Sequence, residues 1–257
     1  MKTIYPIIVS IVLVFFIACE SETLEEPFDG PNFELRVDIS HGDQEVELYE
    51  YYQNVAGDSM NFEQILLYLS DISLIKTNGD SVYLTEIEFF DLNGPTEVRS
   101  FDVEPGDYSG LVYHIGVPKR LNGMDNPDFM ISIYGPDSPL NVANGMYWAW
   151  ATGYRFLIYE GRLDTTPDVF GDVPSFYSIH LGKDTLYTQM QVDLPFSVSD
   201  EETRSFSIDW DLSRSIYDTE DTLDLRIPAE SQWHGENNHL GFRFQDFLKQ
   251  SFDHAVE

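Results

Sequence analysis

Two histidines occupy the same local pattern, in which an imidazole is followed two residues later by glycine. His114 begins His114-Ile115-Gly116, and His180 begins His180-Leu181-Gly182. Each alternates with apolar neighbours, so the imidazole points away from the apolar face of an extended strand. Glycine at this position lets a backbone or a ligand approach closely, and imidazole is a common metal ligand. The pattern suits metal ligands, and it equally suits hydrogen-bonded or solvent-facing structural histidines.

A further pair of imidazoles lies near the C-terminus. His234 follows Trp233, and His239 comes five residues later, after Gly235-Glu236-Asn237-Asn238. Residues five apart do not share a helix face, so this spacing is typical of a loop. A loop that brings two imidazoles together is a candidate for half of a metal site. The remaining histidines, His41 and His254, are expected to be exposed and without a role.

Two of the four tryptophans stand two residues apart in an aromatic segment. Trp148 and Trp150 follow Met146, and positions i and i+2 of an extended segment face the same side of a sheet. Such a ladder is either a ridge of the core or the wall of an electron-rich pocket. Trp210 belongs to the alternating apolar segment 206–212 and is expected in the core.

Several short motifs surround these residues in a definite order. They are Gly116-Val117-Pro118, Leu121-Asn122, Pro139-Leu140-Asn141, Met146-Tyr147-Trp148-Ala149-Trp150, Gly153-Tyr154-Arg155-Phe156 and His180-Leu181-Gly182. This order resembles the MbnP family, periplasmic copper-binding proteins first associated with methanobactin operons, with lipoprotein relatives in Bacteroidota. The resemblance runs from about Phe33 to about Phe252, and the Met-x-Trp-x-Trp-x-x-Gly-Tyr signature is its most specific part.

The resemblance implies copper, whose ligands in this chain would come from the imidazoles of six His and the thioethers of six Met. The candidate ligands are His114, His180 and His234 or His239, since thiolate is absent once the single cysteine is lipidated. Two departures from the family pattern are a Gly at position 123, where proteobacterial members often have His, and the lack of a second cysteine near His-Leu-Gly. They leave open a branch that kept the fold and lost the copper site.

The resemblance also implies a modified tryptophan. Members of the family can carry a Trp oxidised to kynurenine near the copper, installed by a partner dihaem enzyme similar to MauG. The candidates in this chain are Trp148, Trp150 and Trp233.

The first 18 residues have the features of a lipoprotein signal peptide. Lys2 supplies a positive region, 7–17 is an apolar run, and Cys19, the single cysteine, follows Ala18. The run is shorter than the roughly 20 apolar residues of a spanning helix. Phe16-Ile17-Ala18-Cys19 resembles a lipobox, so Cys19 is expected to carry the lipid.

The signal predicts the domain organisation and the location. Residues 1–18 are removed, 19–31 form an acidic tether broken by Pro and Gly, and 32–257 form one MbnP-like domain. Because Glu20 differs from the Asp that retains enterobacterial lipoproteins in the inner membrane, we expect an outer-membrane lipoprotein that faces the periplasm or the exterior. The lipid is expected to be its sole contact with the membrane.

The charge balance excludes nucleic acid as a partner. The chain has 14 Lys and Arg against 45 Asp and Glu, for a net charge of −31. Such a surface repels polyanions and anionic membranes and raises the local concentration of cations.

Residues 32–257 show the pattern of an all-β domain. Residues 33–39 alternate strictly, and 67–75 are apolar with a phase change near Asp71 that indicates a bulge. Short alternating segments separated by Gly, Pro, Asn and Asp predict an antiparallel β-sandwich. Helical spacing predicts a short C-terminal helix through Leu240, Phe244, Phe247, Leu248 and Phe252.

A rival interpretation belongs to another functional class. The chain would be a surface lipoprotein that binds a glycan or a partner protein through an aromatic platform of Tyr147, Tyr154 and Tyr159. Its metal would then be structural calcium on oxygen donors from Asp209, Asp211, Asp218, Glu220 and Asp221. The sequence contains no phosphate loop, HExxH or CxxC motif and no recognisable nucleophile triad, so the chain is expected to be non-enzymatic.

The lipid anchor gives the first testable prediction. If Cys19 carries acyl chains, the mature protein should partition into detergent, and Cys19→Ser should release it into the aqueous phase. Intact-mass measurement of the native protein provides the control, and an unmodified Cys19 would remove the lipoprotein assignment.

Overall fold

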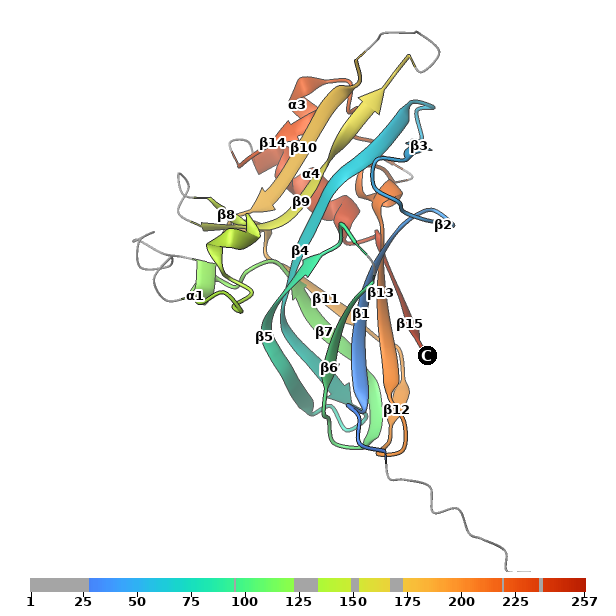
Figure 1. The fold of residues 1–257 in the computed structure, drawn as a ribbon, viewed down its shortest axis with the longest axis vertical. Helices are drawn as coiled ribbons and strands as arrows, with labels where there is room; N and C mark the ends of the chain where they lie inside the picture. Colours follow the sequence, from blue (N-terminus) through green and yellow to red (C-terminus); the bar gives the residue numbers. More distant parts are fainter. Residues whose placement is uncertain are drawn as a thin grey trace, which may run out of the picture.

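The computed structural model describes residues 28–94, 96–122, 134–148, 153–166, 173–218, 220–235 and 238–257. The expected signal peptide, Cys19 and Trp150 lie outside these ranges. The described residues form an elongated molecule (Figure 1). Within them, no helix combines the length and the apolar character needed to cross a membrane.

The smaller sheet is built on a parallel pair of strands. β1 (Phe33–His41) runs beside β13 (Arg204–Asp211) in parallel. β13 also pairs with β15 (Phe252–Val256), and β1 pairs with β6 (Glu97–Phe101) and β2 (Gln44–Glu45), all antiparallel.

The larger sheet is organised around one long strand. β4 (Ser59–Lys76) pairs with β3 (Tyr51–Gln53) and β9 (Gly153–Asp164) along its first half, and with β5 (Ser81–Asp91) and β7 (Gly106–Ile115) along its second half. The second half of β4 lies in the part of the molecule where the larger sheet faces the smaller one (Figure 1).

The other strands extend this sheet on both sides. β10 (Ser175–Gly182) pairs with β9, and β14 (Gln232–Trp233) pairs with β10. β8 (Tyr147–Trp148) pairs with the start of β9, while β11 (Thr188–Val192) and β12 (Phe196–Val198) pair with β7.

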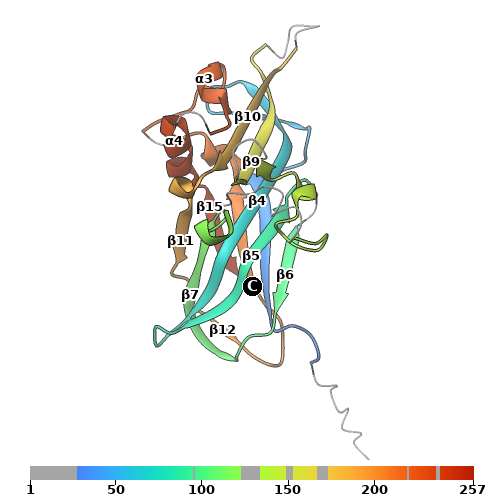
Figure 2. The same ribbon diagram turned by 90° about the vertical axis from the view of Figure 1, so that its left-hand side faces the viewer.

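Short helices cover the half of the larger sheet that the smaller sheet leaves open. α3 (Pro228–Ser231) and α4 (Asn238–Leu248) lie beside β9 and β10 in both views (Figures 1 and 2). α1 (Lys119–Asn122) and the 3-10 turns η1 (Val142–Asn144), η2 (Asp184–Leu186) and η3 (Leu212–Ser215) complete the described elements.

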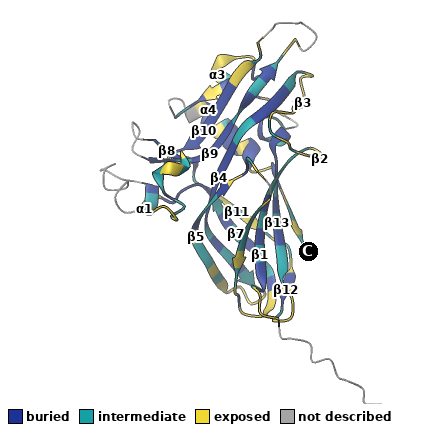
Figure 3. Cartoon of the chain, in the orientation of Figure 1, coloured by how far each residue is buried: buried dark blue, intermediate teal, exposed yellow. Residues whose placement is uncertain are grey.

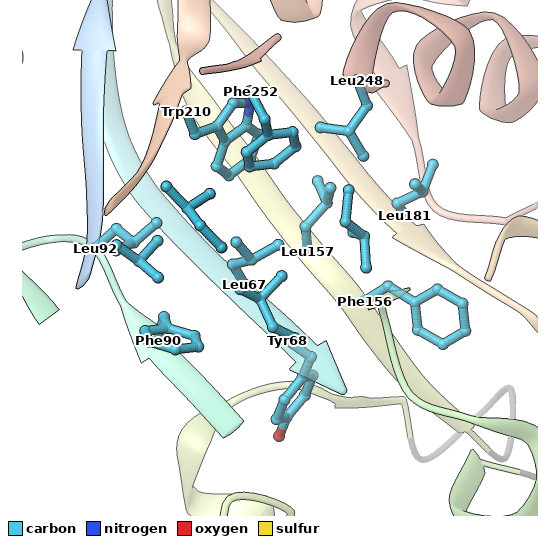
Figure 4. Packing of buried hydrophobic residues seen from close by; sticks show 14 of the residues in the cluster. Leu67, Tyr68, Phe90, Leu92, Phe156, Leu157, Leu181, Trp210, Leu248 and Phe252 are labelled. Carbon is cyan, nitrogen blue, oxygen red and sulfur yellow. The ribbon is translucent and has the colours of Figure 1, made fainter. Parts of the chain in front are cut away.

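The core runs between the two sheets and continues under α4. Buried residues on β1 and β13 follow the alternation expected of strands with one face inside (Figure 3). Leu67 and Leu157 of the larger sheet pack near Trp210 and Phe252 of the smaller one, with Leu248 of α4 close by (Figure 4).

The structure confirms the all-β sandwich and several of its details. The bulge expected near Asp71 is present, because the β4–β5 register shifts between Ile72 and Ser73 and Asp71 has a φ of 47°. Trp210 is fully buried, stacks on Phe252 and donates from Nε1 to Ser215 Oγ.

Two expectations need correction. The sandwich is not wholly antiparallel, because β1–β13 and β10–β14 are parallel pairs; alternation identifies strands and faces but contains no information on direction. The C-terminal helix is present but ends at Leu248, and Phe252 begins β15 instead. Phe252 fits the helical spacing, but it faces the same core from a strand, so spacing alone placed the end of the helix too late.

Candidate metal site

Strand pairing brings four polar side chains together at one edge of the larger sheet. Glu160 on β9 lies directly opposite Ser178 on β10. His180 stands two residues beyond Ser178 on the same face. β14 runs on the other side of β10, with Trp233 opposite Ile179, so the next residue, His234, arrives beside the same face. We call Glu160, Ser178, His180 and His234 the β10 cluster.

The β10 cluster is a closed hydrogen-bond network. Glu160 Oε1 accepts from Ser178 Oγ at 2.8 Å and lies 2.5 Å from His180 Nε2. Ser178 Oγ also lies 3.1 Å from His180 Nε2 and 2.9 Å from His234 Nε2. The two imidazole rings have centroids 4.5 Å apart. The Nε2 atoms of both histidines therefore point toward the same hydroxyl.

The charges of the network favour a cation. Burial lowers the pKa of His180, although Glu160 acts in the opposite direction, so the imidazole is neutral at pH 7. Burial acts to raise the pKa of Glu160, but hydrogen bonds from His180 and Ser178 bring it below its usual value. The cluster thus combines a carboxylate with neutral imidazole at neutral pH.

Trp148 closes one side of the cluster. Its indole is buried, with a ring centroid 6.5 Å from that of His180, and the Arg155 guanidinium lies 5.6 Å above it. A Cβ on Gly182 would come within 2.6 Å of Trp148 Cζ3. Glycine two residues after His180 is therefore needed for a close approach, and what approaches is the Trp148 ring.

The structure does not unite all four predicted histidine ligands. It brings His180 and His234 together, whereas His114 lies on β7, separated from β10 by β4 and β9. At about 4.8 Å per strand, three steps place the two backbones on the order of 14 Å apart. His114 instead stacks on Tyr187, with ring centroids 4.7 Å apart.

His239 and Trp233 also have other surroundings. His239 is exposed at the start of α4. A hydrogen bond from Arg243 is the main cause of the lowered pKa of Asp221, and the nearby His239 has a smaller effect in the same direction. Trp233 is buried beneath α4, where a Cβ on Gly241 would lie 2.8 Å from its Cζ2. Trp150 lies outside the described residues.

The two histidines expected to be exposed are partly buried. The His41 ring packs 5.0 Å from Tyr52, and His254 Nε2 lies 3.0 Å from Tyr113 Oη between the sheets. His41 ends β1 and His254 lies within β15, so both belong to strands of the smaller sheet where a linker and a chain terminus were expected.

The calcium expectation has no support in the described residues. The carboxylates proposed for it already have partners: Asp209 accepts from Ser40, Asp211 from Ser213 and Arg214, and Asp221 from Arg243.

The aromatic platform is also wrong, because Tyr154 and Tyr159 are buried in the sheet. Their hydroxyls donate to the backbone carbonyls of Leu140 and Leu212. The alternation that places them on β9 does not reveal that both faces of this strand are covered.

The donor set of the β10 cluster suits copper, which binds imidazole nitrogen and carboxylate oxygen. As they stand, the described residues contain no group of three or more His, Cys, Asp or Glu arranged to hold a metal ion. Glu160 and His180 are in direct contact at 2.5 Å. Two ligands of one ion, each about 2 Å from it, are separated by about 3 Å, so Glu160 must retreat by a fraction of an ångström for metal to enter.

Sequence reasoning assigned no role to Glu160 or Ser178. Ser178 lies two residues before His180 on the same strand, so the sequence alone could have predicted that the two side chains share a face. Glu160 is one of 45 acidic residues, and only the β9–β10 register distinguishes it from the rest.

Comparison with known proteins identifies a protein family that the chain matches. A family model described as MbnP matches residues 30–232, a range that includes Glu160, Ser178 and His180 and ends just before His234. A solved structure, MbnP from Methylosinus trichosporium, is similar at 14% sequence identity, over 74% of this chain and 78% of that chain, with a TM-score of 0.44. No curated protein matches the chain.

The electrostatics of the β10 cluster predict how His180 titrates. Because burial dominates, we expect its imidazole to gain a proton only below pH 6.5. Neutral His180 then stabilises the fold fully above that pH, and the contribution is lost as the pH falls through the lowered folded-state pKa. Histidine ring NMR, with His180→Gln for assignment, measures the midpoint. Glu160→Gln removes the charge that favours the imidazolium and should lower the midpoint further; an upward shift would contradict the account.

Proposed function

Since the chain belongs to the MbnP family, we propose that it is a lipid-anchored copper-binding protein that captures or handles copper outside the inner membrane. His180 and His234 supply the imidazole ligands in this proposal. Copper is the cargo that the family resemblance implies, and the chain acts as a binding protein, without a catalytic role.

One observation carries the proposal: Nε2 of His180 and Nε2 of His234 lie 3.1 and 2.9 Å from the same Ser178 hydroxyl. Two imidazoles that converge in this way can bind one ion through modest side-chain movements. The Nε2 proton that His180 shares with Glu160 must move to Nδ1 when a metal binds there. Neutral His180 therefore releases no net proton, and affinity falls only as the pH drops through the lowered pKa of His180. Glu160 then balances part of the charge of the ion.

The same geometry argues against a hydrolase with Ser178 as nucleophile. In a nucleophile triad, the base contacts the nucleophile through one ring nitrogen and an orienting carboxylate through the other. Here Ser178 and Glu160 both meet Nε2 of His180. Because one nitrogen contacts both groups, the network lacks the relay that activates a serine hydroxyl. The arrangement is compatible with binding a cation.

The start of β1 and the β10 cluster lie in different parts of the described fold. β1, which follows the tether in the chain, begins at the end of the molecule farthest from α3 and β14 (Figure 1). The described end of the tether, residues 28–31, therefore joins the fold away from the β10 cluster, which suits access by a soluble copper donor or acceptor.

Removing both imidazoles tests the copper proposal. His180→Ala with His234→Ala should weaken copper binding at the β10 cluster by more than about 100-fold, so that one equivalent of bound copper is lost, because loss of ligands exceeds the effect of outer-shell changes. Competition titration against a copper chelator measures it, and His239→Ala, which removes an exposed imidazole, is the matched control. An unchanged number of bound copper equivalents in the double variant, with the fold intact by circular dichroism, would sink the proposal.

Trp148 is the residue we propose for oxidation to kynurenine by a MauG-like dihaem partner. Its support is the indole held beside the His180 imidazole. Peptide mapping of protein from the native host should find the mass gain of kynurenine on the peptide that contains Trp148, while Trp210, which is deep in the core, stays unmodified. An unmodified Trp148 in copper-loaded native protein would assign it a structural role alone.

A further inference from the structure

A small cavity lies on the smaller-sheet side of β4, away from the β10 cluster. It has a volume of about 210 Å³ and is bordered by the end of β1, by β3 and by the residues around η3. His41, Gln53, Met60, Ser213 and Tyr217 are among its lining residues. The cavity therefore combines an imidazole with a thioether.

The imidazole of His41 has an unused ligand atom. Nε2 is buried and has no hydrogen-bond partner among the described residues. Burial lowers the pKa of His41, against the opposing effect of Asp211, so the ring is neutral at pH 7. A buried nitrogen without a partner is costly, by roughly 1 to 3 kcal/mol, so this atom calls for a donor, a water or a cation.

Met60 lines the same cavity as this imidazole. Met60 is fully buried and lies directly opposite Tyr52 in the β3–β4 pair. The His41 ring packs 5.0 Å from Tyr52 and 6.0 Å from Phe62, which follows Met60 by two residues on the same face of β4. The thioether has no proton to donate to Nε2, but both atoms are good ligands for a soft cation.

The surrounding charge favours a cation as well. Asp211 is buried, and its Oδ1 accepts from the backbone N–H of Gly42, the residue after His41. Asp211 shares the guanidinium of Arg214 with Asp253, while burial and the neighbouring carboxylates raise the pKa of Asp209. This corner of the smaller sheet therefore carries more negative charge than its single arginine balances.

We propose that His41 and Met60 form a second metal site, specific for a soft monovalent cation, with Cu(I) as the natural occupant. The site takes imidazole nitrogen from the end of β1 and thioether sulfur from the start of β4. It is separate from the β10 cluster, so the two proposals stand or fall independently.

The test uses the mature chain with His180→Ala and His234→Ala, which removes the β10 cluster as a ligand source. Cu(I) is titrated under anaerobic conditions against a chromogenic Cu(I) chelator. We expect one equivalent of Cu(I) to remain bound, and Met60→Leu in this background to weaken it by about tenfold or more. Leucine conserves the volume of the side chain, so packing changes little. Met190→Leu, the same change on β11, is the matched control.

Several outcomes would overturn the proposal. Absence of bound Cu(I) in the double variant means that Nε2 of His41 binds a water or faces an empty cavity. Equal affinity in the Met60→Leu and Met190→Leu chains excludes the thioether. X-ray absorption that shows nitrogen without sulfur around the copper excludes the pair. His41→Gln should also lose the ion; if that variant fails to fold by circular dichroism, Met60→Leu still decides.

Discussion

The position of β10 between β9 and β14 determines which side chains can meet at the candidate metal site. The β9–β10 register sets Glu160 opposite Ser178, and the parallel β10–β14 pair delivers His234 to the same face. A slip of one residue in either pair would turn a side chain to the other face. The hydrogen bonds, the burial and the proximity of Trp148 all follow from this arrangement.

Burial of this edge of the sheet determines the protonation states of the cluster. Buried imidazole prefers to be neutral, whereas the hydrogen-bonded Glu160 stays ionised. Gly182 allows the Trp148 ring to approach the same region closely, and the Arg155 guanidinium lies over that ring. An ion that enters therefore meets the neutral imidazole of His180 and one compensating carboxylate. These are conditions in which a protein can hold a soft or borderline metal firmly.

Sequence reasoning recovered what depends on local pattern. Alternation identified the strands, the phase change located the bulge at Asp71, and the His-Leu-Gly motif marked both His180 and a close approach at Gly182. It missed what depends on strand neighbours. His114 and His180 share a motif, but nothing local shows that two strands separate them. Glu160 becomes distinctive only through its register, and His41 was judged by its place in the chain, whereas its environment is set by β3 and β4.

The central claim is that His180 and His234 bind one copper ion together. An anomalous-difference map from crystals soaked with copper, recorded on both sides of the copper absorption edge, tests it most directly. The account predicts a peak about 2 Å from Nε2 of both residues, with Glu160 displaced from its 2.5 Å contact with His180. Peaks confined to other parts of the chain, with the β10 cluster still hydrogen-bonded and without metal, would contradict it.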